Sequence, residues 1–217
     1  MDRTSRLIKL VLSLGLAVAA TSSAAAAADT SGAVLTKVEY QQLRAMQAGT
    51  KAAAGNAHGS LRAALPACRR ALGVSPLLRA SKAKCEALLY YAIADLNIVS
   101  AVRRCDKVKT ADAALNCLTP SFSAFSGESE ALVLAVRRVV RVATARKFKS
   151  DCVAALGTSK AGLSLLSRFA DDVRVLVASM RAHNLGLFDV AIKRVDGLEG
   201  SLKSIRKPGS ISICPHQ

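Results

Sequence analysis

Residues 75–105 read SPLLRASKAKCEALLYYAIADLNIVSAVRRC, and this stretch decides the fold class. Ser75 can accept a hydrogen bond from the first turn of a helix and Pro76 suits the first helical position, so the pair predicts a helix start. Apolar and small side chains then recur at steps of three and four, which keeps one helix face apolar for about seven turns. That stripe comprises Leu78, Ser81, Cys85, Leu89, Ala92, Leu96 and Val99. We expect this helix to end near residues 105–108.

Similar patterns follow downstream. Thr119-Pro120 repeats the cap-plus-proline signal and predicts a helix with the heptad spacing of coiled-coil-like packing, so that residues 110–118 form only a short connector. Thr158-Ser159 predicts a further helix that stops near residues 184–186, and the last helix runs from Leu187 to before Pro208. The three stripes are Phe122, Phe125, Ser129, Leu132, Val136, Val139 and Ala143; Leu163, Leu166, Ala170, Val173, Val177 and Met180; and Ala191, Val195, Leu198, Leu202 and Ile205.

The region upstream of Ser75 is also helical by pattern. Thr36 and Glu39 form a capping box that predicts a helix from about residue 34 to the high 50s. Ser60 can cap a second piece, which Pro66 should bend or restart and Gly73 should end.

Helical patterns therefore account for the whole region, and alternation of β-branched residues is nowhere sustained. Heptad stripes joined by short connections predict antiparallel neighbours. We expect an all-α fold, a single-domain up-down antiparallel bundle of four to five main helices over residues 29–217, with an irregular tail at 207–217.

Residues 1–28 have the organisation of a secretory signal peptide. Arg3, Arg6 and Lys9 precede an apolar run at 10–20, and the alanines at 24–28 offer small residues for cleavage after Ala28. The alternative is an uncleaved membrane anchor, for which this run is short. We therefore expect a secreted, periplasmic or cell-envelope protein with no transmembrane segment in its mature chain.

Charge is the most unusual property of the composition. The 217 residues contain 31 Lys and Arg against 15 Asp and Glu, a net charge of +16, and 51% hydrophobic residues. Removal of the signal leaves 189 residues with a net charge of +14. Such a chain has ample apolar surface to fold, which excludes an intrinsically disordered protein.

All six cysteines lie in the predicted mature chain, which indicates three disulfides in an exported protein. Cys85 and Cys105 lie 20 residues apart on one predicted helix, roughly 30 Å, and cannot pair. Cys105 and Cys117 flank one turn and form the strongest predicted pair. The other four leave three options, among which topology favours Cys68–Cys85 and Cys152–Cys214.

Few residues suggest chemistry. Met180 and His183 lie three apart, as haem or copper ligands in a bundle can, but we expect instead a core methionine beside an exposed histidine near a helix C-terminus. Asp171 and Asp172 point about 100° apart on a helix, so with Arg174 they predict a solvated, ion-paired face. Arg103 falls on the apolar stripe near a helix end, where its side chain should reach outward.

The basic residues between 137 and 149 are the one feature above background, because six occur there without an acid. Placed on a continuous helix, all but Lys147 cover one half of its surface. Such a face is either the solvated side of a generally basic exported protein or a surface that contacts an anionic surface or polymer. These anion-contacting candidates are Arg137, Arg138, Arg141, Arg146 and Lys149.

The sequence thus predicts an exported, disulfide-stabilised, non-enzymatic helical protein that contacts an anionic envelope surface or a protein partner. We expect no cofactor, no catalytic or metal-binding residues and no sequence-specific nucleic-acid binding, since the few aromatic residues fall mostly on core stripes. The alternative is a carrier of a small apolar ligand, haem or a metal in the bundle interior.

Overall fold

The structure, a computed structural model, describes residues 33–53, 58–205 and 210–217, so the predicted signal peptide lies outside the described residues. Within these ranges the protein is helical throughout and contains no β-strand, which confirms the all-α class. The helices are α2 (Lys37–Ala53), α3 (His58–Arg69), α4 (Pro76–Cys105), α5 (Ala111–Ala145), α6 (Ser150–Leu156), α7 (Lys160–Arg181) and α8 (Leu185–Ile205), followed by the one-turn 3-10 helix η1 (Ile211–Ile213).

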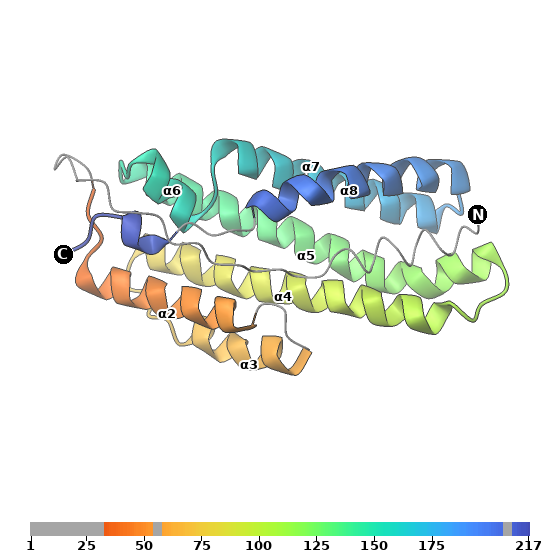
Figure 1. Ribbon diagram of the computed structural model, residues 1–217, viewed down its shortest axis with the longest axis horizontal. Helices are drawn as coiled ribbons and strands as arrows, with labels where there is room; N and C mark the ends of the chain where they lie inside the picture. The colour runs from red at the N-terminus through yellow and green to blue at the C-terminus, as the bar shows by residue number, and fades with distance from the viewer. Residues whose placement is uncertain (1–32, 54–57, 206–209) are drawn as a thin grey trace.

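The antiparallel pair of α4 and α5 forms the long axis of the molecule (Figure 1). The α7–α8 hairpin packs along one part of this pair, while α2, α3, α6 and η1 lie toward its other end. Most helices that follow one another in the chain pack together; α6 and α7 are the exception, since each packs against α5 instead.

Two clusters of buried apolar side chains divide this arrangement. The first is shared by α4, α5, α7 and α8 and contains Tyr91, Phe125 and Phe169, whose rings form a chain of contacts with centroids 5.0 and 6.1 Å apart. The second joins α2, α3, the first half of α4, the end of α5, α6 and η1. Helices α4 and α5 contribute side chains to both clusters, so their apolar stripes extend over more turns than one core requires.

Several helix ends follow the predictions. Ser75 caps α4 by accepting a hydrogen bond from the Leu78 amide, with Pro76 at the first position, and α4 ends at Cys105. Ser159 caps α7 in the same way through the Gly162 amide. Helix α8 begins two residues before the expected Leu187.

The predicted helix start at Thr119-Pro120 is wrong. Thr110 caps α5, which continues through the expected connector and past Pro120, an exposed residue. Leu115 and Leu118 are buried in the first cluster, and Cys117 is bonded to Cys105. Packing and the disulfide thus hold nine residues helical ahead of a proline that removes one helical hydrogen bond.

Pro66 likewise lies inside α3 and does not restart it. Leu65 and Cys68 on either side of it are buried in the second cluster, while the proline ring faces outward. The seven-residue helix α6 has no counterpart in the predictions. The tail is also more ordered than expected, since residues 210–217 contain η1 and a bridge between Leu35 and His216.

The disulfides are Cys68–Cys85, Cys105–Cys117 and Cys152–Cys214, with Cα atoms 5.6, 5.9 and 4.8 Å apart. These are the pairings that helix topology favoured. They fasten α3 to α4, α4 to α5, and α6 to the C-terminal tail. Three such pairs are consistent with an oxidising, exported environment.

Of the described helices, α4 is long and apolar enough by composition to cross a membrane, with a mean hydropathy of 1.4 over its most apolar window. The sequence predicts no transmembrane segment after the signal peptide. More than half of that window, 56%, is buried inside the protein, as in the core helix of a soluble protein.

Candidate anion-binding surface

The predicted basic face begins on the last turns of α5. Arg137, Arg138 and Arg141 are exposed there, and the Arg137 guanidinium reaches Ser167 Oγ of α7 at 3.4 Å. Val136, Val139 and Ala143, on the opposite side of α5, are buried. The three arginines therefore lie on a solvent-facing side of α5, as the sequence predicts.

The helix then ends differently from the expectation, which treated residues 137–149 as one helix. The Lys147 amide donates to Thr144 O and the Phe148 amide to Ala143 O, while Lys147 has a positive φ of 59°. This is a Schellman motif, in which the chain turns sharply and buries an apolar residue, here Phe148. Lys147, which was left out of the predicted face, is exposed at this turn together with Lys149.

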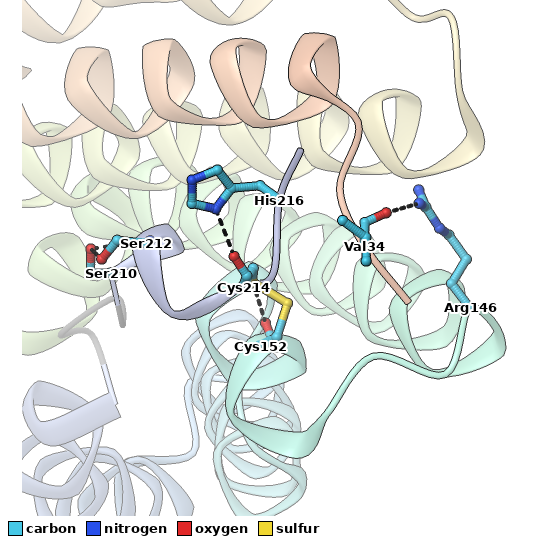
Figure 2. Close-up of a disulfide and its surroundings, with 7 residues drawn as sticks. All are labelled: Val34, Arg146, Cys152, Ser210, Ser212, Cys214 and His216. Carbon is cyan, nitrogen blue, oxygen red and sulfur yellow. Dashed lines mark hydrogen bonds between the residues drawn. A yellow bond between two sulfur atoms is a disulfide. The ribbon is translucent and has the colours of Figure 1, made fainter. Parts of the chain in front are cut away.

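Arg146, by contrast, turns toward the protein. Its Nη1 lies 2.5 Å from Glu39 Oε1, its Nη2 donates to Val34 O at 3.1 Å, and its guanidinium lies over the Phe148 ring (Figure 2 shows the Val34 contact). With 30% of its side chain exposed and its charge paired, Arg146 is not placed to bind an external anion. We therefore define the α5 basic patch as Arg137, Arg138, Arg141, Lys147 and Lys149.

Glu39 is the centre of a buried polar network that positions this end of the molecule. The same Oε1 that pairs with Arg146 accepts a hydrogen bond from Ser75 Oγ at 2.7 Å, and Oε2 accepts one from the Thr36 amide at 3.1 Å. The Glu39 amide in turn donates to Thr36 Oγ1, which completes the predicted capping box. One carboxylate thus joins the starts of α2 and α4 to the end of α5.

The electrostatic state of Glu39 follows from these contacts. Burial alone raises the pKa of its carboxyl. The hydrogen bonds from Arg146, Ser75 and Thr36 and the charge of Arg146 outweigh burial, so the pKa lies below its ordinary value of 4.5. Glu39 is therefore ionised at neutral pH, and its charge is neutralised by Arg146.

The C-terminal tail completes this end. Cys214 is bonded to Cys152 of α6, and the Leu35 amide and carbonyl exchange hydrogen bonds with Pro215 O and the Gln217 amide (Figure 2 shows the disulfide). The His216 ring stacks on Tyr40 of α2, with centroids 3.8 Å apart. Both described chain ends are therefore fixed beside the α5 basic patch.

Charge is distributed unevenly over the described chain. Residues 131–150 carry six Lys or Arg and no acid. Residues 37–84 carry nine Lys or Arg, and Glu39 is the one acid in that range. The α4–α5 turn carries charges of both signs, because the exposed Asp106 and Asp112 lie among Arg103, Arg104, Lys107 and Lys109, and Asp112 lies 3.0 Å from His183 Nδ1. The segments at the end with the α5 basic patch therefore differ from this turn in having few acids.

The remaining candidates take structural positions. Met180 is fully buried in the first cluster, whereas His183 is exposed in a second Schellman turn after α7, so the two do not face a common site. Asp171 pairs with Arg174 at 3.0 Å on an exposed face, and Arg103 points to solvent. Among the described residues, no group of three His, Cys, Asp or Glu side chains is placed to hold a metal ion.

Sequence reasoning missed one polar site. A cavity of about 80 Å³ between α2, α4, α6 and η1 is lined by the polar side chains Lys84, Ser81, Gln47 and Thr50 together with apolar ones. Lys84 Nζ donates to Leu156 O at the end of α6, and burial lowers the pKa of Lys84 to about 8. Ser81 belongs to the apolar stripe, and its buried hydroxyl has no hydrogen-bond partner within the part of the chain that the structure describes. This cavity is far smaller than the roughly 300–1,000 Å³ pockets of typical ligands, so as it stands it does not accommodate haem.

Comparison with protein-family models, with curated proteins and with solved structures found no match.

Proposed function

We propose that this is an exported, non-enzymatic protein, built as a single up-down helical bundle, that contacts an anionic surface of the cell envelope through the α5 basic patch. The supporting observation is the concentration of five exposed cations where α5 ends, none of them ion-paired within the described residues. The one buried acid nearby, Glu39, is already neutralised by Arg146. A surface of this kind attracts lipid headgroups or phosphate-bearing polymers by long-range electrostatics.

Export is supported by the predicted signal peptide together with the three disulfides. The disulfides fasten elements at both ends of the α4–α5 pair, which suits a protein that works outside the reducing cytoplasm. A surface that binds by charge needs a rigid support but no catalytic group.

The proposal is tested by binding to heparin, a soluble polyanion, and to vesicles that contain phosphatidylglycerol. R138E/R141E should weaken both by at least about tenfold, because each substitution replaces an attraction by a repulsion. R103E/R104E is the matched control, since it makes the same change of net charge on exposed residues at the end of α4. Arg146 is unsuitable as a probe because its removal leaves Glu39 buried without its partner.

Salt dependence provides the second measurement. Binding should fall steeply between low and high ionic strength, since exposed charges are screened over roughly 10 Å at 0.1 M salt. Binding that is unchanged by salt, or that R103E/R104E weakens as much as R138E/R141E, would contradict the proposed role of the patch.

A further inference from the structure

Besides Ile213 of η1, four large apolar side chains are exposed at the same end of the molecule as the α5 basic patch. Their exposed fractions are 38% for Val34, 46% for Val38, 54% for Leu72 and 67% for Val74. Leu72 and Val74 lie in the loop between α3 and α4, while Val34 and Val38 flank the start of α2. We call these four residues the apolar tip.

The Glu39 network joins three chain segments: the start of α2, the loop before α4 and the end of α5. Ser75, which follows Val74, donates to Glu39, which follows Val38. The Leu72 amide donates to Gln42 Oε1 at 3.3 Å, and Gln42 lies one turn after Val38 on α2. Arg146 bridges the same Glu39 to the Val34 carbonyl. Figure 1 shows the starts of α2 and α4 and the end of α5 at one end of the molecule.

The loop that carries Leu72 and Val74 is firmly braced. The Cys68–Cys85 disulfide fastens the end of α3 to α4, and Arg79 Nη1 donates to Gly73 O at 2.9 Å. Lys82 Nζ donates to Arg69 O at 2.5 Å. These contacts hold the backbone while the two apolar side chains stay in solvent, an arrangement with no benefit for folding.

Several cations belong to the same chain segments as the apolar tip. Arg79 and Lys82 brace its loop, the exposed Arg70 precedes it, and the exposed Lys37 is next to Val38 in the chain. The Arg69 guanidinium, by contrast, donates to the Tyr90 hydroxyl at 2.7 Å. The α5 basic patch adds further positive charge on the other side of the Glu39–Arg146 pair. Exposed apolar side chains with Lys and Arg in the same chain segments match the two layers of an anionic bilayer, in which headgroup charge overlies acyl chains.

We infer that the apolar tip inserts Leu72 and Val74 into the interfacial region of an anionic lipid bilayer, while the cations of these segments contact the headgroups. This inference rests on the proposed function and specifies its partner as lipid. Electrostatic attraction brings the protein to the surface, and burial of the tip adds a component of binding that salt does not screen.

The test compares L72S/V74S with L187S/V190S. The control removes the same pair of residue types from α8, where Leu187 is 42% and Val190 46% exposed, away from the tip. L72S/V74S should weaken binding to phosphatidylglycerol vesicles about tenfold and leave binding to heparin unchanged, whereas the control should alter neither. Circular dichroism checks that both variants retain the helical fold.

A second measurement reports insertion directly. The chain contains no tryptophan, so V74W places a single fluorophore at the tip. Its emission should shift to shorter wavelength on phosphatidylglycerol vesicles and be quenched by brominated acyl chains. L187W, the control, should keep its emission unchanged.

The outcomes separate the inference from the proposed function. If R138E/R141E weakens vesicle binding but L72S/V74S does not, or if V74W is not quenched, the inference is wrong while the proposed function stands. If wild-type protein binds neither heparin nor vesicles, the proposed function itself fails. Self-association that L72S/V74S abolishes, with no vesicle binding, would make the tip a contact between copies and also overturn the inference.

Discussion

Replacing Glu39 by glutamine tests the network that joins α2, α4 and α5. Glutamine has nearly the same shape and preserves the capping box with Thr36, but it carries one acceptor oxygen where the carboxylate has two. Oε1 accepts from both Arg146 and Ser75, and Oε2 accepts from the Thr36 amide. Whichever way the glutamine amide is oriented, its NH2 group faces at least one of these donors. One N–H of this buried network is therefore left without an acceptor.

The expected loss follows from these contacts. An unsatisfied buried donor costs about 1–3 kcal/mol, and loss of the pairing with Arg146, which is partly screened by solvent, adds about 1 kcal/mol. We expect E39Q to lower the free energy of unfolding by about 2–4 kcal/mol at pH 7 and the Tm by roughly 5–15 °C. Urea unfolding of the oxidised protein, followed by circular dichroism, measures the first quantity. E130Q, on the exposed face of α5, is the matched control.

The pH dependence provides the stricter test. Because the pKa of Glu39 is lowered in the folded state, its contribution is complete above the unfolded value and is lost as pH falls through the folded pKa. The difference between wild type and E39Q should therefore be constant at about pH 6–8 and shrink below about pH 4. A double-mutant cycle with R146M should give a coupling of about 1–3 kcal/mol. The reasoning is refuted if E39Q unfolds like E130Q, or if the difference persists unchanged in acid.

Three further predictions concern buried or unusual positions. K84M should stabilise the protein by about 2–3 kcal/mol at pH 7, since a largely buried ammonium with a pKa of about 8 opposes folding while it is charged. Wild-type stability should rise between about pH 8 and 10 and close the gap, as urea unfolding over that range will show. Under native conditions, mild reductant should open Cys105–Cys117 first, because Cys117 is exposed whereas both cysteines of each other pair are buried; alkylation and peptide mapping identify the order, and early release of Cys152 or Cys68 would contradict it. P120A should raise stability by about 1–3 kcal/mol, because it restores a hydrogen bond to the Asn116 carbonyl at an exposed position; an unchanged urea midpoint would argue against it.

Local patterns predicted the helix ends well where capping residues act alone. Ser75-Pro76, Ser159 and the Thr36–Glu39 box all satisfy backbone groups within one turn, so their effect does not depend on distant residues. The same cap-plus-proline pattern at Thr119-Pro120 does not start a helix, because tertiary contacts hold the residues before it in α5. Leu115 and Leu118 are buried against other helices, and the Cys105–Cys117 disulfide holds the segment on α4.

The candidate surface was predicted only in part for a similar reason. Helical geometry places Arg137, Arg138 and Arg141 together, and the structure has them exposed on α5. Extending the helix to Lys149 missed the turn at Lys147, whose left-handed backbone carries no glycine as a signal. The pairing of Arg146 with Glu39 joins residues 107 positions apart, and no local pattern reports such a contact.

The sequence by itself determined the all-α class, the caps of α2, α4 and α7 and the Cys105–Cys117 pair, and it favoured the other two cysteine pairings without deciding them. These properties depend on periodicity and on hydrogen bonds within single turns, which neighbouring residues control. Tertiary structure alone decided that α5 continues through Pro120, that Glu39 accepts from Ser75 and Arg146, and that Val34, Val38, Leu72 and Val74 share one end with the basic patch. Each of these depends on which distant side chains meet, and that is settled by packing around the α4–α5 pair.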